Sequence, residues 1–321
     1  PGVVIKNPRV REIHEMAERA AAGTIPVLIY GETGVGKELL AETIHAHSTR
    51  SSGPLVAVNC AALSESLLES ELFGHEKGAF TGATMMRKGL FEAANGGTLF
   101  LDEVGEMSPV MQAKFLRVLE THQVFPVGGT KPRPVDVRIV AATNRDLKTE
   151  VAAGRFRRDL FFRLNGIQLT IPPLRERPDE IEPITRLVLE SLATQIHRPV
   201  PDLDPRVIEL LQQYPWPGNV RELRNTMERA FLLCTSSTIT LAHLPEESMR
   251  QSIERERTLA PAPGGSDTAI EWRKRRADSE KQAMLNALSR CNGNRTRAAE
   301  LLGMPRSTFM RKMNEYELTN T

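Results

Sequence analysis

A glycine-rich stretch near the amino terminus has the residue types and spacing of a phosphate-binding loop of the Walker A type. The stretch consists of Gly31, Glu32, Thr33, Gly34, Val35, Gly36, Lys37 and Glu38. Its glycines let successive backbone N–H groups turn toward phosphate oxygens, and a helix that starts here adds positive potential. The Lys37 ammonium would reach the β- and γ-phosphates of a nucleotide. The alternative is a purely structural turn, which a lysine at this spacing disfavours.

Two adjacent carboxylates, Asp102 and Glu103, follow an apolar run and stand 65 residues beyond Lys37. An aspartate at the carboxyl end of a parallel strand can hold Mg²⁺, and the adjacent glutamate can polarise an attacking water. Alone, such a run would be a weak indication. Together with the glycine-rich loop, it predicts a site that binds ATP and Mg²⁺ and hydrolyses ATP. One position departs from the usual pattern, because Glu38 stands where Ser or Thr normally ligates Mg²⁺.

These residues need a scaffold, and the first 170 residues have the pattern of a doubly wound α/β domain. Short, nearly continuous apolar runs are typical of parallel strands that helices cover on both faces. We expect strands at 27–30, 55–58, 98–101, 137–142 and 167–170, and helices at 37–48, 64–73 and 109–121. Beyond Pro172 only helical periodicity remains, which predicts a small all-helical lid with helices at 180–196, 205–214 and 219–234.

Composition places the chain among ordinary globular proteins. It has 321 residues, of which 40% are hydrophobic and 26% are charged, and no apolar run approaches the roughly 18 residues that a membrane span requires. Its three cysteines are far apart, so we expect neither a disulfide framework nor a zinc site, and we expect a cytoplasmic location. The chain begins with Pro1 rather than Met, which is compatible with a fragment of a longer protein.

Charge is distributed unevenly along the chain. Residues 1–248 contain 28 Lys or Arg against 31 Asp or Glu, whereas residues 269–321 contain 11 against 6. A basic end on a near-neutral body indicates contact with a polyanion, although a solvated basic surface is an alternative of similar weight. We expect four regions: an α/β subdomain at 1–171, a lid at 172–247, a flexible linker at 248–268 and a basic helical domain at 269–321.

A hexapeptide lies between the two nucleotide motifs. It consists of Gly78, Ala79, Phe80, Thr81, Gly82 and Ala83. From its residues alone it is a mobile loop with an apolar tip, or a simple surface turn. With its neighbours, however, it resembles the signature of bacterial enhancer-binding proteins, the sigma-54-dependent transcription activators of the AAA+ ATPase superfamily. The resemblance extends from about Val4 to Glu247, and glutamate after the Walker A lysine is usual in this family.

The resemblance implies a function and an assembly. Residues 78–83 would contact sigma-54 and remodel the closed complex of RNA polymerase during ATP turnover. The protein would form a ring, usually of six subunits, with dimeric DNA-binding domains on enhancer DNA. It would act as a two-component or otherwise signal-responsive regulator, with no sensory domain before Val4 in this sequence.

The resemblance also assigns roles to five further residues. Asn59 would pair with Glu103 and sense the γ-phosphate, and Asn144 would be the sensor I residue. Arg157 and Arg163 match the arginine fingers, which one subunit supplies to the site of its neighbour. Arg221 matches sensor II, in the first turn of a helix that Asn219 could cap. The alternatives are strand-end amides that satisfy turns, and a surface basic helix that bonds to local acids. Residues 128–133 resemble a second pore-side loop.

The basic tail reads as two helices joined by a glycine turn. Ala298 and Ala299 allow close crossing, and Leu302, Phe309 and Met313 supply a small core. The tail is similar to the Fis-type helix-turn-helix, with its candidate DNA contacts on the second helix: Arg306, Ser307, Thr308, Arg311 and Lys312. A protein–protein helical module is the alternative. Leu285 and Leu288 could serve either a dimer interface or the core.

Two other functions fit parts of the sequence. One is a DNA-binding regulator whose nucleotide site only controls assembly. The other is an AAA+ unfoldase or a partner of a protease, which the hexapeptide and the basic tail oppose. ATP turnover that rises with protein concentration would argue against the first alternative, because assembly control needs nucleotide binding without hydrolysis.

Overall fold

The computed structural model describes residues 4–80 and 83–259, together with parts of the tail: 281–282, 284–289, 291, 294–302, 304, 309–310, 312–313 and 316. Two hexapeptide residues, Thr81 and Gly82, lie outside the described residues. So do four candidate DNA contacts, Arg306, Ser307, Thr308 and Arg311. The chain divides into two compact units between Ile253 and Glu254.

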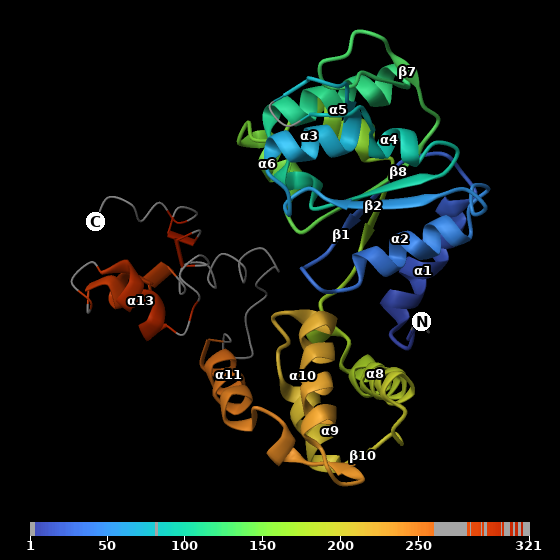
Figure 1. The fold of residues 1–321 in the computed structure, drawn as a ribbon. Coiled ribbons are helices and arrows are strands. Elements are labelled where there is room, and N and C mark those ends of the chain that lie inside the picture. The colour runs from blue at the N-terminus through green and yellow to red at the C-terminus, as the bar shows by residue number, and fades with distance from the viewer. Residues whose placement is uncertain are drawn as a thin grey trace. The chain divides into compact units, whose positions relative to one another are not determined.

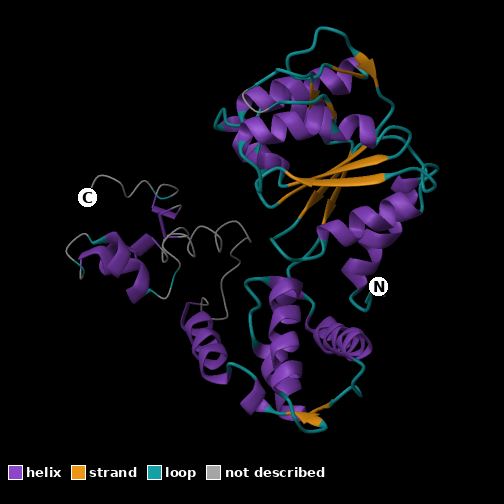
Figure 2. Ribbon diagram, in the orientation of Figure 1, coloured by secondary structure: helices purple, strands orange, loops and turns teal. Residues whose placement is uncertain are grey.

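The first unit is built around a five-stranded parallel sheet with strand order β2-β5-β8-β1-β9. Its strands are β1 (Val27–Tyr30), β2 (Leu55–Asn59), β5 (Thr98–Asp102), β8 (Arg138–Thr143) and β9 (Ile167–Thr170). All five lie within one residue of the expected ranges. Helices lie on both faces of this sheet (Figures 1 and 2). The structure therefore confirms the predicted α/β class.

Alternate residues of each central strand enter two separate cores, as the period-two geometry of a strand requires. One core packs Ile29, Phe100 and Val140 against α1 (Pro8–Ala21) and α2 (Lys37–Ala46). The opposite core packs the neighbouring strand residues Leu28 and Leu101 against helices on the other face. These helices are α3 (Glu65–Phe73), α4 (Leu90–Ala93), α5 (Pro109–Thr121), α6 (Leu147–Ala152) and α7 (Arg158–Leu164).

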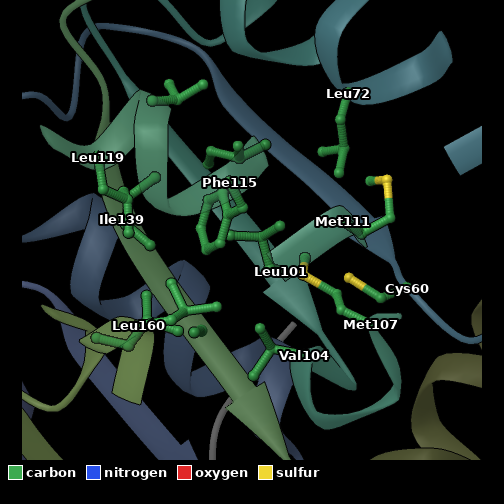
Figure 3. Close-up of a cluster of buried hydrophobic side chains, with 14 of the residues drawn as sticks. Cys60, Leu72, Leu101, Val104, Met107, Met111, Phe115, Leu119, Ile139 and Leu160 are labelled. Carbon is green, nitrogen blue, oxygen red and sulfur yellow. The ribbon is translucent and has the colours of Figure 1, made fainter. Parts of the chain in front are cut away.

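The second of these cores connects the segment after β5 to helix α5. Leu101, Met107, Met111 and Phe115 are all buried there, and Cys60 packs beside them (Figure 3). Burial of large apolar side chains stabilises by about 1.5–3 kcal/mol each, so this cluster holds the end of β5 firmly. The short turn η1 (Val104–Glu106) joins β5 to α5, whose amino terminus is capped by Ser108.

Two short antiparallel hairpins follow α3 and α5. The first pairs β3 (Gly74–His75) with β4 (Arg87–Lys88), and the second pairs β6 (Gln123–Val124) with β7 (Arg133–Pro134). The tip of the first hairpin contains the hexapeptide. The loop of the second hairpin pairs with the first hairpin, because the N–H of Glu76 donates to the carbonyl of Val127 at 3.0 Å and the N–H of Val127 donates to the carbonyl of Gly74 at 2.8 Å.

The lid is helical, as predicted. Its core buries Leu189, Leu211, Trp216 and Phe231. Its elements are the turns η2 (Leu174–Glu176), η3 (Pro178–Glu180) and η4 (Leu241–His243), the helices α8 (Ile181–Ile196), α9 (Pro205–Gln213), α10 (Asn219–Leu233) and α11 (Glu246–Leu259), and the parallel pair β10 (Asp202–Leu203) and β11 (Thr238–Ile239).

The expectation of a flexible linker from residue 248 is wrong for its first twelve residues, because α11 extends from Glu246 to Leu259. Two contacts favour the helix. Met249 is buried in the lid core, and Arg250 pairs with Glu246 one turn earlier at 2.8 Å. Among the described side chains of this helix, Glu247, Arg250 and Glu254 are exposed.

In the second unit, residues 284–289 are helical and α13 extends from Arg295 to Leu301. The side chain of Asn294 accepts hydrogen bonds from the N–H groups of Thr296 and Arg297, which caps α13. Members of the expected small core are buried here, with others packed against them: Leu285, Leu288, Ala298, Ala299, Leu302, Phe309 and Met313. Leu288 therefore serves the core. Lys312 is half-buried.

No helix in the described part of the chain is both long and apolar enough to span a membrane. All three cysteines are free thiols.

Candidate ATP-hydrolysis site

The candidate residues gather at the carboxyl ends of β1, β5 and β8. These three strands lie beside one another in the sheet, so the segments that follow them meet at one edge. In open parallel sheets this edge is where ligands bind. The glycine-rich loop follows β1, Asp102 ends β5, and Asn144 follows β8 directly.

The loop wraps around the amino terminus of α2, with Gly34 at φ +81° and Gly36 at φ +108°. Such left-handed conformations favour glycine. At Gly34 a side chain would also meet the carbonyl of Gly218, because a Cβ at this position would lie only 2.4 Å from that oxygen. Backbone conformation and a close approach thus both require glycine at this position.

Lys37 lies inside the loop. Its side chain is 5% exposed, and its Nζ donates to the carbonyls of Gly31 (3.1 Å) and Glu32 (3.4 Å) and to Oε1 of Glu103 (3.4 Å). The structure therefore brings together the predicted phosphate-binding lysine and the predicted water-polarising glutamate.

Glu103 has an unusual backbone and precise contacts. Its φ of +53° is rare for a residue other than glycine, and such strain is concentrated at functional sites. Its N–H donates to Oδ1 of Asp102 at 3.0 Å, and its Oε2 accepts from the N–H of Asn144 at 3.3 Å. Asn144 also donates from Nδ2 to the hydroxyl of Thr33 at 3.3 Å. Asn144 thus connects the glutamate to the glycine-rich loop, where a sensor of the γ-phosphate would stand.

Charge around Asp102 is predominantly negative. Burial raises the pKa of this carboxyl, Lys37 lowers it, and the nearby carboxylates of Glu103 and Glu38 raise it further. The pKa of the neighbouring Cys60 thiol rises to about 12, mainly through burial and then through the charges of Asp102 and Glu103. Such a site favours a cation, whose binding would keep Asp102 ionised.

The expected pairing of Asn59 with Glu103 is not present among the described contacts. Asn59 ends β2 beside Asp102, but its side chain is exposed, and its Oδ1 accepts from the N–H of Ala61 at 2.8 Å. The local turn after β2 satisfies this amide, which is the alternative considered for a strand-end asparagine. Asn59 is thus a strand-end residue, as expected, and its pairing with Glu103 stays a prediction.

The way the lid holds the glycine-rich loop was not predicted. Arg175 donates from Nη1 and Nη2 to the two carboxylate oxygens of Glu32, at 2.8 and 2.7 Å. Asn219 is fully buried and donates to Glu32 and to the carbonyl of Thr33. Asn219 does not cap α10: Gly218 holds that position, and the Oδ1 of Asn219 accepts from the N–H of Leu174. The sequence motif correctly placed Asn219 at the start of this helix, but it did not predict the contacts of its side chain.

A buried ion pair adds a second link between these segments. Arg177 and Glu180 pair at 3.1 Å with side chains 6% and 0% exposed, and Arg177 also donates to the carbonyl of Val35 at 2.8 Å. The other carboxylate oxygen of Glu180 accepts from the N–H groups of Lys6 and Asn7. The glycine-rich loop, the start of the lid and the segment before α1 are therefore fixed to one another.

Arg221 reaches the same region from α10. Its N–H donates to the carbonyl of Gly34 at 3.3 Å, and its side chain is exposed. It lines a cavity of about 430 Å³ together with Thr33, Gly218, Glu222, Asn225, Thr226, Arg229 and Pro245. Arg221 is thus next to the loop, although the cavity does not include Lys37 or Glu103, and its sensor II role stays a prediction.

Arg157 and Arg163 lie at the two ends of α7, and not at the carboxyl ends of β1, β5 and β8. Arg157 is the cap residue of α7, and its guanidinium pairs with Asp159 at 2.7 Å. Arg163 donates to the carbonyl of Leu119 at 3.0 Å. Both side chains are exposed, and within the described residues neither bonds to the nucleotide motifs of its own chain. This placement agrees with residues that act on another subunit.

The described part of the hexapeptide forms a tight turn with an apolar surface. The N–H of Gly78 donates to the carbonyl of Ala83, and the N–H of Ala83 donates to that of Phe80. The Phe80 ring is 47% exposed and contacts the ring of His75, with centroids 5.0 Å apart. The adjacent Met85 is 75% exposed.

Replacing Arg175 with alanine is expected to weaken ATP binding by about fivefold, because a partly exposed bidentate pair contributes on the order of 1 kcal/mol. ATP affinity would fall because the ion pair between the lid and the glycine-rich loop would be missing. The measurement is calorimetric titration with ATP. Arg186→Ala is the matched control, since Arg186 pairs with Glu182 on the surface of α8. Equal weakening by both substitutions would contradict a specific role for the Arg175–Glu32 pair.

Comparison with known families agrees with this geometry. A family model described as "Sigma-54 interaction domain" matches residues 3–170. Two others, described as "AAA+ ATPase lid domain" and "Bacterial regulatory protein, Fis family", match residues 175–260 and 275–316. The lid match includes α11, in agreement with the structure.

Curated relatives match nearly the whole chain. The transcriptional regulatory protein ZraR of Klebsiella oxytoca is 46% identical over 98% of this chain and 68% of its own length. The regulatory protein AtoC of Escherichia coli is 46% identical over 98% of this chain and 67% of its own.

Among solved structures, NtrX from Brucella abortus, in complexes with ADP and with ATP, matches at a TM-score of 0.72. It is 36% identical and covers 98% of this chain and 70% of its own. Sequence, fold and the arrangement of Lys37, Asp102 and Glu103 agree on one conclusion. This chain belongs to the sigma-54-dependent transcription activators, which are AAA+ ATPases with a Fis-type DNA-binding domain.

Proposed function

We propose that ATP hydrolysis at Lys37, Asp102 and Glu103 moves the hairpin of residues 74–88 against sigma-54 and so remodels the closed complex of RNA polymerase. The observation that carries this proposal is an exposed apolar tip, with Phe80 and Met85 at 47% and 75% exposure, inserted between the two nucleotide motifs. Residues 78–83 would make the contact.

Two hydrogen bonds support a path from the site to this tip. The N–H of Cys60, next to Asn59, donates to the carbonyl of Asp102 at 2.9 Å. Ser108, which follows the Glu103 turn, donates its hydroxyl to Glu65 at 2.7 Å. Glu65 begins α3, and α3 leads directly into the hairpin. A change at Glu103 could therefore reach α3 by two routes. One runs through the segment that begins at Asn59, and the other runs through Ser108 and Glu65.

A second hairpin braces the first. Arg133, the first residue of β7, binds Glu76 of the first hairpin at 2.7 Å and Glu92 of α4 at 2.9 Å, so partly buried ion pairs join the second hairpin to the first and to α4. This supports a role for residues 128–133 as a second loop beside the hairpin that is proposed to contact sigma-54.

Mg²⁺ is proposed as the metal, with Asp102 as its protein ligand. Carboxylate oxygen suits Mg²⁺, which usually keeps several waters and binds through one or two carboxylates and substrate phosphates. Among the described residues, no group of three His, Cys, Asp or Glu side chains could hold a metal by itself. ATP phosphates and water would therefore complete the coordination shell, and the metal would neutralise charge on the transferred phosphoryl group.

The active form is proposed to be a ring, with six subunits as the expected number. Arg157 and Arg163 would each enter the site of the next subunit, where Arg221 and Asn144 of that subunit contact the γ-phosphate. The Fis-family match supports enhancer DNA as the second partner. Dimeric DNA-binding domains, with Lys312 among the contacts, are part of the same proposal. Control by a two-component or other signal and a location in the cytoplasm complete the proposal.

Thr81→Ala tests the coupling between chemistry and movement. ATPase activity should stay within a few-fold of wild type, because residue 81 is remote in sequence from the phosphate-binding residues, while sigma-54 capture and promoter opening should fall at least tenfold (~1.4 kcal/mol). Both activities are measured on one preparation, the capture with a transition-state analogue of ATP.

The matched control is Thr84→Ala, a substitution of the same type at an exposed position of the same hairpin. It should leave both activities unchanged. Normal sigma-54 capture by Thr81→Ala would refute the role proposed for residues 78–83.

A further inference from the structure

A fully buried glutamine on α5, Gln112, joins the segment after Glu103 to the segment that carries Arg157. Its Nε2 donates to the carbonyl of Met107 at 2.8 Å and to that of Arg155 at 3.0 Å. Its Oε1 accepts from the N–H of Arg157 at 2.8 Å. The exposed fraction of this side chain is zero.

These three contacts define the orientation of the amide. The nitrogen has two donors and both are used, while the oxygen faces an N–H. An amide turned by 180° would set its oxygen against two carbonyls and its NH₂ against an N–H. A buried polar side chain with this pattern selects one arrangement of the two segments, which a purely apolar residue could not do.

The two segments belong to different sites in the proposed ring. Met107 ends the turn that starts at Glu103, and it is therefore joined directly to the hydrolysis site of its own subunit. Arg157 caps α7 and is proposed to act on the neighbouring subunit. We propose that Gln112 is a positioning residue that sets the backbone of Arg157 according to the state of the Glu103 turn, and so connects one hydrolysis site to the next.

Other contacts stabilise the same region, but they do not set the direction of the Arg157 backbone as Gln112 does. Phe156 is buried in the same core as Met107, which supports the fold without fixing the direction of the Arg157 backbone. A surface chain also runs from Glu106 through Arg145 and Glu150 to Arg155. Its pairs are partly exposed, so they constrain geometry weakly.

Gln112→Met tests the proposal, because methionine fills a similar volume without hydrogen bonds. A misplacement of about 1 Å can cost on the order of 10²-fold in rate, so kcat should fall about 10²-fold while the KM for ATP stays close to wild type. Gln212→Met, at an exposed position of α9, is the matched control and should change neither value. A raised KM with unchanged kcat would overturn the proposal.

Mixed rings distinguish a positioning role from damage to the variant's own site. This test rests on the proposed function of Arg157 across the subunit interface. Rings of Gln112→Met with Lys37→Ala subunits should regain turnover, because the second subunit supplies a correctly placed arginine to the intact site of the first. Rings of Gln112→Met with Arg157→Ala subunits should not, because every site would then face a defective arginine.

The reverse pattern would overturn the inference, since it would place the defect in the variant's own hydrolysis site. Rings of Arg157→Ala with Lys37→Ala serve as the reference. If these reference rings do not regain turnover, the trans role of Arg157 is refuted, and the inference with it. If they do regain turnover, the rings that contain Gln112→Met test the role of Gln112 alone. Gln112→Glu, which keeps the acceptor oxygen and lacks both donors, carries the same test if Gln112→Met does not assemble.

Discussion

Replacing Arg157 with alanine is expected to lower kcat for ATP by about 10³- to 10⁵-fold, the range found when an arginine finger is removed. ATP binding by the isolated subunit should not change, because Arg157 is exposed and bonds to Asp159 rather than to the nucleotide motifs. In the assembled ring, the charge that develops on the transferred phosphoryl group would lack the arginine of the neighbouring subunit. The substitution should therefore affect hydrolysis in the ring and not ATP binding by a single subunit. Arg163→Ala should reduce turnover in the same direction.

Steady-state phosphate release and calorimetric ATP titration separate the two effects. Arg158→Ala is the matched control, because Arg158 is the next residue and its guanidinium lies over the ring of Phe162, 5.7 Å from the centroid. Arg157→Ala and Lys37→Ala subunits mixed in one ring should regain activity. Wild-type turnover by Arg157→Ala rings, with assembly verified by mass, would exclude the proposed finger.

Replacing Glu103 with glutamine is expected to slow hydrolysis by about 10²- to 10⁴-fold, which is the usual contribution of a positioned general base. Glutamine keeps the shape, and it still accepts a hydrogen bond from the N–H of Asn144. It cannot, however, take a proton from water. ATP affinity should be retained or should rise, because the carboxylate that now pairs with Lys37 would no longer compete with the phosphates.

Single-turnover hydrolysis and ATP binding measure these two quantities on the same sample. Glu42→Gln, at an exposed position of α2, is the control for a lost surface charge. Loss of ATP binding in Glu103→Gln would contradict the assignment of Glu103 to chemistry rather than to binding.

The main elements and the phosphate site could be predicted because both depend on contiguous residues. Strands such as 98–101 carry apolar residues on both faces, and the structure accordingly buries Phe100 in one core and Leu101 in the other. Lys37, Asp102 and Asn144 each follow or end a parallel strand. Their meeting at one edge follows from topology once the strands are assigned.

Contacts between distant segments could not be predicted in the same way. Arg175 and Glu32 are separated by 143 residues, and no local pattern distinguishes their pairing from an ordinary surface charge. Gln112 reads in sequence as one polar residue in an amphipathic helix, and only the fold shows that it is fully buried. For Asn59 the sequence left two partners open, and the structure shows the local one, because the backbone N–H of Ala61 donates to its side-chain oxygen.

The linker expectation failed for a different reason. Between Glu246 and Leu259 charged residues dominate, and this composition is common both to linkers and to solvent-exposed helices. The apolar residues that decide the matter are few: Met249 is buried, and Ile253 packs against the same core. Two apolar side chains give only a weak helical periodicity, so the composition of this segment did not reveal the helix.

In the proposed mechanism, hydrolysis of ATP, rather than its binding alone, drives sigma-54-dependent promoter opening. The most direct measurement is open-complex formation on a sigma-54 promoter, with saturating ATP, by wild-type rings and by Glu103→Gln rings whose ATP binding and assembly have been verified. We expect opening by the wild type and a loss by the variant in proportion to its slower hydrolysis. Opening at the wild-type rate by rings that bind but do not hydrolyse ATP would contradict the mechanism, and would favour a nucleotide site that only controls assembly.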